Sequence, residues 1–294
     1  MEKKINIIKR IFLIAIAMVS ILVIAKTQNV YAADTYKAIE LNDGGIYKVG
    51  KYYLKYVYNE QKLYVGNSQN GEFTLTPMPT YGLFSNGKTV YYIKDKKLCQ
   101  YNLANKKAKN VKKLSSIYSS DDDAYVSIKA YYGGNFYITK SSFEKWKYTT
   151  YYYNLSSKKL KLAKDECCIQ SQKGKYVLVT SDYRTDVSTG AEYVFQLTKT
   201  GMKEIKKLTN NGLSATFVGK NIYYVDYPKT DMKKAVLYKT TITGKSKTKI
   251  ATFTTKQEYD QVIVSEITSK SCKVNMNSTS YLYTYKTKKL KKIG

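Results

Sequence analysis

The chain has 294 residues, with 50 Lys and Arg against 22 Asp and Glu, no histidine, and a net charge of +28 at pH 7. The lack of histidine excludes Ser-His-Asp and Cys-His catalytic arrangements and zinc sites built on imidazole. The large positive charge favours anionic partners, and for an exported protein these are wall polymers, anionic surfaces or acidic polysaccharides rather than nucleic acid. A lysine coat that only confers solubility is the alternative explanation of the same composition.

Residues 1–32 have the pattern of a secretory signal peptide. Four basic residues among the first ten precede the apolar run from Ile11 to Ala25, and Val30-Tyr31-Ala32 offers small residues at the cleavage positions. The run is about 15 residues long, whereas a membrane-spanning helix needs roughly 20, so cleavage is favoured over retention as an anchor. We therefore expect a secreted or cell-envelope-associated protein of residues 33–294, with a net charge of +24 and no stable membrane span.

A unit of short strands recurs from Gly50 to the end of the chain. Each copy has a turn glycine, two aromatic strands and a lysine-rich closing strand, as in Gly87–Ile93, Leu98–Leu103 and Lys106–Leu114. The turn positions are Gly50, Gly87, Gly134, Gly174, Gly219 and a degenerate sixth at Ser269-Lys270. One such unit cannot bury both faces of its sheet alone, so the copies must stack, and a strand repeat of roughly 40 to 50 residues indicates a β-propeller.

The strands expected in each copy follow in chain order. Inner strands precede the turns, as in Tyr125–Tyr132 and Gln261–Ile267. The second strand of each hairpin is expected at Gln61–Val65, Leu98–Leu103, Thr149–Leu155, Glu192–Leu197, Val236–Thr240 and Tyr281–Tyr285. The segment Tyr36–Leu41 could complete the last blade or cap the first. The sequence predicts an all-β fold, a single six-bladed propeller of four antiparallel strands per blade, over residues 33–294.

The tyrosines and cysteines have a structural interpretation. We expect most of the 32 tyrosines to fill the wedges between blades, with their hydroxyl groups reaching water or backbone. Cys99, Cys167, Cys168 and Cys272 fall in copies 2, 4 and 6, which are not neighbours, so we expect unpaired, buried thiols.

The repeats resemble six-bladed propellers of the TolB-like and YWTD types over roughly residues 36–294. Tyr223-Tyr224-Val225-Asp226 is similar to the tetrapeptide that names the second type, whereas Tyr91-Tyr92-Ile93-Lys94 departs further from it. The resemblance implies the architecture, with ligands or protein partners on the face formed by the loops that enter the inner strands and link the middle ones. It does not imply a specific activity.

No motif for catalysis, for a metal or for a cofactor stands out. A pair of carboxylates could in principle hydrolyse a glycosidic bond, but the acidic residues lie in no recognisable motif, so we expect that the protein is not an enzyme. The acidic run Asp121-Asp122-Asp123 lacks the interleaved glycine of a calcium loop, and we expect a solvated turn there.

Binding residues are expected on the long hairpin loops of copies 3 to 5, Ser141–Lys147, Ser181–Gly190 and Tyr227–Lys234. These loops open on one face of the predicted propeller. They carry the candidate ligand-binding residues Trp146, Tyr183, Arg184 and Tyr227. Trp and Arg are frequent anchors of binding interfaces. The alternative is that these loops are sites where insertions are simply tolerated.

The sequence as a whole favours a secreted, monomeric, non-catalytic binding or scaffold module at an anionic cell envelope. Its expected partner is an anionic wall polymer, a polysaccharide or a protein. The alternatives are an extracellular receptor or sensor propeller for a protein partner and, third, a carbohydrate-active enzyme.

Overall fold

The computed structural model describes residues 35–294 except 42–44, 119–123, 143–146, 182–189, 214, 230, 244, 257–260 and 294. The chain divides into two compact units, Met1–Tyr36 and Lys37–Gly294. Residues 35 and 36 are the described part of the first unit, so the predicted signal peptide lies outside the described residues. In the described part of the chain, no helix is long and apolar enough to cross a membrane.

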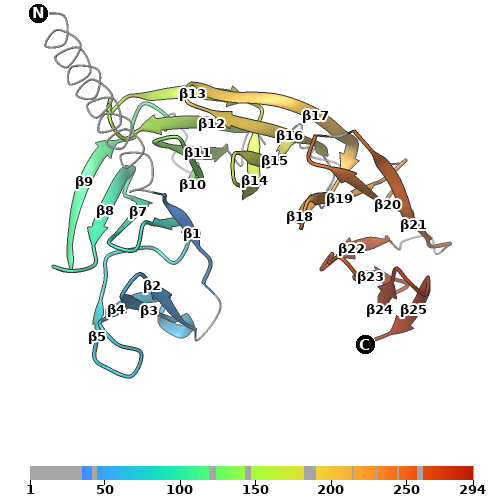
Figure 1. Ribbon diagram of the computed structural model, residues 1–294, viewed down its shortest axis with the longest axis horizontal. Coiled ribbons are helices and arrows are strands. Elements are labelled where there is room, and N and C mark those ends of the chain that lie inside the picture. Colours follow the sequence, from blue (N-terminus) through green and yellow to red (C-terminus); the bar gives the residue numbers. More distant parts are fainter. Residues whose placement is uncertain are drawn as a thin grey trace, which may run out of the picture. The chain divides into compact units, whose positions relative to one another are not determined.

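The second unit consists of six antiparallel sheets, which confirms the prediction of an all-β, six-bladed propeller (Figure 1). The first sheet contains β2 (Ile46–Val49), β3 (Tyr52–Val57), β4 (Lys62–Gly66) and β5 (Phe73–Leu75), with a short 3-10 helix at Tyr58–Glu60. The second sheet contains β1 (Lys37–Ile39), β6 (Leu83–Ser85), β7 (Thr89–Lys94), β8 (Lys97–Asn102) and β9 (Lys107–Lys113). The third sheet contains β10 (Tyr125–Tyr132), β11 (Asn135–Ser142), β12 (Lys147–Asn154) and β13 (Leu160–Asp165).

The remaining three sheets repeat the four-strand order. The fourth contains β14 (Cys168–Lys173), β15 (Tyr176–Ser181), β16 (Gly190–Thr198) and β17 (Gly201–Gly212). The fifth contains β18 (Ala215–Val218), β19 (Asn221–Asp226), β20 (Lys234–Thr241) and β21 (Lys247–Thr254). The sixth contains β22 (Ile263–Ser265), β23 (Ser271–Met276), β24 (Thr279–Thr284) and β25 (Lys289–Lys292). In all six copies, the segment predicted as the second strand of the hairpin overlaps an observed strand.

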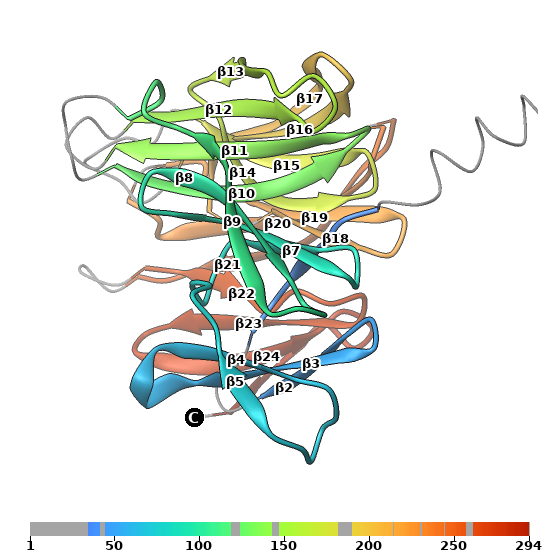
Figure 2. The same ribbon diagram turned by 90° about the vertical axis from the view of Figure 1, so that its left-hand side faces the viewer.

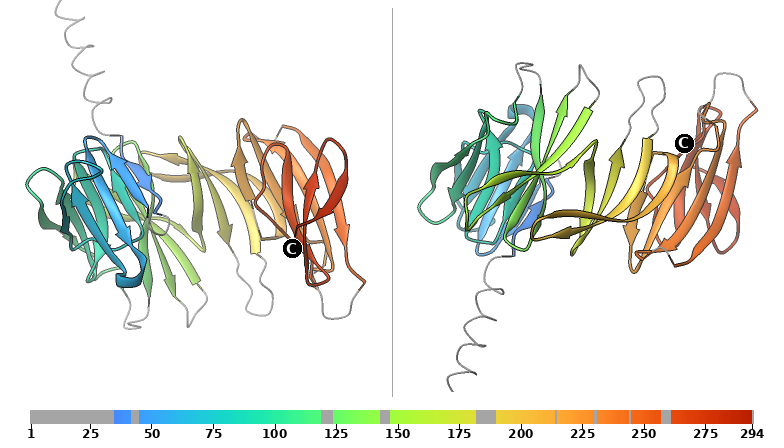
Figure 3. Two further views of the ribbon diagram at one scale, coloured as in Figure 1. Left: turned by 90° about the horizontal axis from the view of Figure 1, so that it is seen from below. Right: turned by 90° about the horizontal axis from the view of Figure 1, so that it is seen from above.

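Each sheet packs against the next one in chain order. Apolar clusters join the first sheet to the second, the third to the fourth, the fourth to the fifth and the fifth to the sixth. Between the second and third sheets, the ring of Phe136 contacts those of Phe84 and Tyr91 at centroid distances of 6.1 and 4.8 Å. In both views of Figure 3 the strands run up and down, so that the turns joining them lie on two opposite sides.

The N-terminal strand β1 takes neither of the places expected for Tyr36–Leu41. It pairs antiparallel with β6, so that Lys37 lies opposite Ser85 and Ile39 opposite Leu83. The second sheet therefore has five strands, with β1 outside β6. The prediction that this segment completes the last blade or caps the first is wrong, because β6 presents a free edge on which an extended segment can add hydrogen bonds.

The tyrosines occupy the positions that the composition predicted. Tyr92, Tyr101, Tyr137, Tyr153 and Tyr224 are among the largest fully buried side chains. The hydroxyl group of Tyr137 donates to the backbone oxygens of Thr198 and Gly201 in the neighbouring sheet. Wide aromatic rings thus fill the wedges between sheets. The hydroxyl group of Tyr137 finds backbone acceptors, whereas that of Tyr153 is buried without a partner among the described residues.

The four cysteines are free and buried, as predicted. Burial raises the pKa of the Cys167 thiol to about 12 and that of Cys272 to about 11. Because the reactive species is the thiolate, all four should resist alkylation in the folded protein and react after denaturation without reduction. Mass spectrometry of iodoacetamide-treated protein checks this, and a thiol that reacts rapidly before denaturation would contradict it.

The predicted turn glycines adopt left-handed backbone, with φ between +56° and +86° at Gly50, Gly87, Gly134, Gly174 and Gly219. Gly50 also touches the second sheet, since a Cβ atom placed on it would lie 2.2 Å from the carbonyl oxygen of Gly87. No atom lies within 4 Å of a Cβ placed on Gly174. The turns of the first two sheets therefore meet backbone to backbone.

This contact predicts a difference between two Gly→Ala substitutions. Gly174→Ala should lower the free energy of unfolding only by the strain of a left-handed alanine, about 1–2 kcal/mol. Gly50→Ala should cost clearly more, because its methyl group must also separate the first two sheets. Urea unfolding of both variants tests this, and equal losses of unfolding free energy would show that the Gly50–Gly87 contact is unimportant.

Candidate functional site

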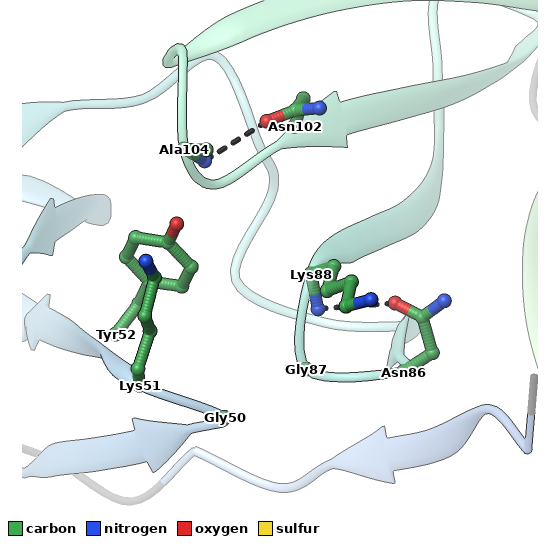
Figure 4. Close-up of a pocket in the computed structure, with 8 residues that line it drawn as sticks. All are labelled: Gly50, Lys51, Tyr52, Asn86, Gly87, Lys88, Asn102 and Ala104. Atoms are coloured by element: carbon green, nitrogen blue, oxygen red, sulfur yellow. Dashed lines mark hydrogen bonds between the residues drawn. The ribbon is translucent and has the colours of Figure 1, made fainter. Parts of the chain in front are cut away.

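A cleft lies where the turns of the first and second sheets meet (Figure 4). It has a volume of about 580 Å³, a size typical of small-molecule sites. It is lined by Gly50, Lys51 and Tyr52 from the first sheet and by Asn86, Gly87, Lys88, Asn102 and Ala104 from the second. In Figure 4, Lys51 and Tyr52 lie on one side of the open space and Asn86 and Lys88 on the other.

The cleft walls are held by local hydrogen bonds. The Asn86 carboxamide oxygen accepts from the backbone N–H of Lys88 at 3.1 Å and of Thr89 at 2.9 Å. The Asn102 carboxamide oxygen accepts from the backbone N–H of Ala104 at 2.9 Å. Both are turn-forming interactions, so they fix the backbone of the two turns that carry the lining residues of the second sheet.

Side chains bridge the corresponding turns elsewhere in the fold. Between the third and fourth sheets, the Gln172 amide group donates to the Tyr131 carbonyl at 2.7 Å. Between the fourth and fifth sheets, the Lys173 ammonium group donates to the Gly219 carbonyl. At the first junction the two turns instead meet through Gly50 and Gly87, which have no side chains to fill the space beside them.

The electrostatic character of the cleft is positive. Lys51 and Lys88 are exposed, and in the described part of the chain neither forms an ion pair. The Lys51 ammonium group lies 5.4 Å from the centroid of the Tyr52 ring, which attracts a cation without neutralising it. None of the lining residues is acidic. Two ammonium groups and the amide groups of two asparagines are suited to an anion that also carries hydrogen-bond acceptors.

Of the four binding residues predicted on the hairpin loops, the structure describes only Tyr227. Trp146, Tyr183 and Arg184 lie outside the described residues. Tyr227 is fully buried in the cluster that joins the fifth and sixth sheets, and its backbone N–H donates to the Asn211 carbonyl at 2.9 Å. The expectation that Tyr227 lies exposed on a binding rim is therefore corrected, because its ring packs in the core.

A second site worth attention is Glu192, a carboxyl group buried where β16 faces the fifth sheet. Only 3% of the residue is exposed, and its Oε2 atom is buried without a hydrogen-bond partner among the described residues. The carboxyl group rests on Gly212, where a Cβ atom would lie 2.4 Å from Cδ. Asp226 lies nearby and accepts a hydrogen bond from the Thr209 hydroxyl group.

Burial raises the pKa of Glu192 to about 8. A backbone hydrogen bond from Ala215 acts in the opposite direction, and the charge of Asp226 raises the pKa further. At neutral pH Glu192 is therefore a neutral carboxylic acid, since ionisation would place an unpaired charge in a dry interface. This arrangement stabilises the folded protein only while the proton stays in place.

The raised pKa predicts a pH-dependent stability. An unfolded glutamate ionises near pH 4.3, so between about pH 4.3 and 8 the folded state holds one proton more than the unfolded state. The free energy of unfolding should then fall with rising pH by up to about 1.4 kcal/mol per pH unit from this residue, with no further loss above pH 8. Urea titrations at several pH values should show that the free energy of unfolding falls less steeply with pH for Glu192→Gln than for the unmodified protein.

The exposed Glu204 on β17 supplies a matched control. Glu204→Gln removes a carboxyl group from the same sheet without changing a buried proton. The slope of Glu204→Gln should match that of the unmodified protein. If Glu192→Gln keeps the full slope, Glu192 is ionised in the folded state and the assignment is wrong.

Within the described ranges, no group of three or more Cys, Asp or Glu residues is placed to hold a metal ion. The acidic run Asp121-Asp122-Asp123 lies outside the described residues, so its interpretation as a solvated turn stays a prediction.

Sequence reasoning missed Lys51, Lys88 and Glu192, the three residues that the structure singles out. Gly-Lys pairs at the turns are visible in the sequence, at Gly50-Lys51, Gly87-Lys88, Gly174-Lys175 and Gly219-Lys220. The sequence does not show which of these turns come together around a cleft. For Glu192, the signal was its place two residues before the apolar Val194, which puts both side chains on one face of a strand.

Comparison with known proteins supports the fold. No family model and no curated protein matches the chain. Among solved structures, an oligogalacturonate lyase from Vibrio parahaemolyticus is similar over 88% of this chain and 84% of its own, with 11% identity and a TM-score of 0.53. An uncharacterised protein from Listeria monocytogenes matches over 89% and 86%, with 10% identity and a TM-score of 0.43. TolB from Acinetobacter baumannii matches over 76% and 57%, with 12% identity and a TM-score of 0.37.

Together with the six antiparallel sheets of the fold, the similarity to the lyase structure confirms the resemblance to known propellers at the level of architecture. The similarity to the lyase also corrects the expectation that the protein is not an enzyme, since a protein of similar fold, with a TM-score of 0.53, is one. The low identities carry the fold and no particular reaction.

Proposed function

We propose that the protein is a secreted or envelope-associated binding protein for an anionic polymer, and that the cleft at Lys51 and Lys88 receives charged groups of that polymer. The observation that carries this proposal is that two lysines, neither of which forms an ion pair among the described residues, line one cleft that has no acidic lining residue. The net charge of the whole chain, +28, adds long-range attraction for polyanions.

Export is the part of the proposal that rests on sequence alone. The basic and apolar pattern of residues 1–32 supports it. A cytoplasmic location would leave the cleft intact but would change the available polymers, so localisation should be determined by fractionation of cells that express the full chain.

The binding test compares two pairs of turn lysines. Lys51→Gln with Lys88→Gln removes both cleft ammonium groups. The control pair is Lys175→Gln with Lys220→Gln, which removes the same charge from two other Gly-Lys turns. Lys175 is a close match to Lys51, because it also follows a left-handed glycine and lies over the next tyrosine, at 5.5 Å from the Tyr176 centroid.

Titration with polyphosphate and with polygalacturonate, followed by calorimetry, should separate the two pairs. The cleft pair should weaken binding of at least one polymer by about tenfold or more, because a hydrogen bond to a charged group contributes about 1.5–3 kcal/mol. The control pair should bind nearly as well as the unmodified protein. Equal effects of the two pairs would mean that diffuse charge, not the cleft, binds the polymer.

Salt separates polymer binding from a protein interface. Contacts between exposed charges are screened at ionic strengths where the Debye length falls below about 8–10 Å. Binding to the polymer should therefore weaken steeply between low and high salt. Binding that persists at high salt would favour the alternative of a receptor for a protein partner.

A further inference from the structure

The outer strand of the second sheet begins at the cleft. Asn102, a lining residue, pairs directly with Lys107, the first residue of β9. The turn between β8 and β9 contains Ala104, which also lines the cleft. A ligand group in the cleft is therefore next to the start of β9.

Lysines continue along β9 away from that point. Lys107 and Lys109 are exposed and lie two residues apart, so they project from the same face of the strand at a spacing of roughly 6.6–6.8 Å. Lys112 and Lys113 follow after a β-bulge. No acidic residue lies in β9, and within the described ranges none of its lysines forms an ion pair. Figure 2 shows β9 at the outer side of its sheet, toward the viewer.

The other outer strands differ in ways that bear on anion binding. β5 has no lysine, while β13 contains Asp165 and β17 contains Glu204. On β21, Lys247 lies over the Tyr238 ring at 3.9 Å from its centroid. β25 carries Lys289, Lys291 and Lys292, all exposed, but it belongs to the sixth sheet, which contributes no lining residue to this cleft.

We propose that the ligand is a linear polyanion that occupies the cleft with one charged group and continues along β9, where successive lysines contact the following groups. The inference rests on the proposed function and names the kind of partner it requires: a polymer with several regularly spaced phosphate or carboxylate groups. A short anion fills the cleft but leaves β9 unused. Binding affinity therefore rises with chain length, because the β9 contacts form at high effective concentration once the cleft is occupied.

Lysines on sheet edges also have a structural role, since they prevent edge-to-edge pairing of sheets. β25 shares that role with β9 but lies on another sheet. It therefore provides the control, and Lys289→Gln with Lys291→Gln reproduces the charge change and spacing of Lys107→Gln with Lys109→Gln.

The experiment measures Kd for short and long forms of two polyanions, tripolyphosphate against long-chain polyphosphate and a galacturonate trimer against polygalacturonate. We expect the unmodified protein to bind the long form of one pair at least about tenfold more tightly per charged group. The β9 variant should lose most of the preference for the long polymer, while its Kd for the short form stays within about twofold of that of the unmodified protein. The β25 variant should keep the preference for the long polymer. The polymer that shows the effect identifies phosphate or carboxylate as the recognised group.

Several results would overturn this inference. Equal losses for the β9 and β25 variants, or no dependence on chain length, would remove the role of β9. Tighter binding of an RNA homopolymer than of both other polymers would show that bases, rather than regularly spaced charged groups alone, are recognised. If short anions bind in a manner that depends on Lys51 and Lys88 while β9 has no effect, the proposed cleft stands and the extension along β9 fails. If short anions bind without any dependence on the cleft lysines, the proposed function itself fails.

Discussion

The structure depends on burial of both faces of the sheets that lie between two others. β7 shows this directly, because Val90 and Tyr92 pack in the cluster shared with the first sheet while the Tyr91 ring contacts Phe136 of the third. β19 repeats the arrangement, with Tyr223 and Val225 facing the sixth sheet and Ile222 and Tyr224 facing the fourth. A strand with apolar residues at every position is stable only between two other sheets, so stacking of the sheets is a condition of folding.

This constraint sends polar residues to the turns and to the outer strands. The lysines therefore gather where the sheets end, and several lie over tyrosine rings, as Lys207 does over Tyr193 at 5.3 Å. Where the third sheet meets the fourth and the fourth meets the fifth, a side chain bridges neighbouring turns. At the first junction two glycines meet instead, and the open space beside them is faced by Lys51 and Lys88. The candidate binding site thus follows from how these two sheets approach each other.

The strand repeat could be predicted from the sequence because its signals are local. Turns with a left-handed backbone favour glycine, and alternation of apolar residues marks a strand packed between neighbouring sheets. The observed β10 therefore has the bounds predicted for Tyr125–Tyr132. The place of β1 could not be predicted, since a three-residue strand has no pattern that specifies its partner. The cleft depends on contact between Gly50 and Gly87, which are far apart in sequence, and the burial of Glu192 depends on the fifth sheet covering it. Tyr227 was misplaced for the same reason, because a residue just after a strand can turn into the core as readily as onto a rim.

The central claim is that two specific turns, rather than the basic surface as a whole, bind an anionic polymer. Lysine footprinting tests it on the unmodified protein: an amine-reactive reagent is applied with and without polyphosphate or polygalacturonate, and the labelled peptides are quantified by mass spectrometry. The account predicts that Lys51 and Lys88 are protected strongly while Lys175 and Lys220, at equivalent turns, keep their reactivity. Uniform protection of all four lysines, or none at Lys51 and Lys88 when polymer is bound, would contradict it.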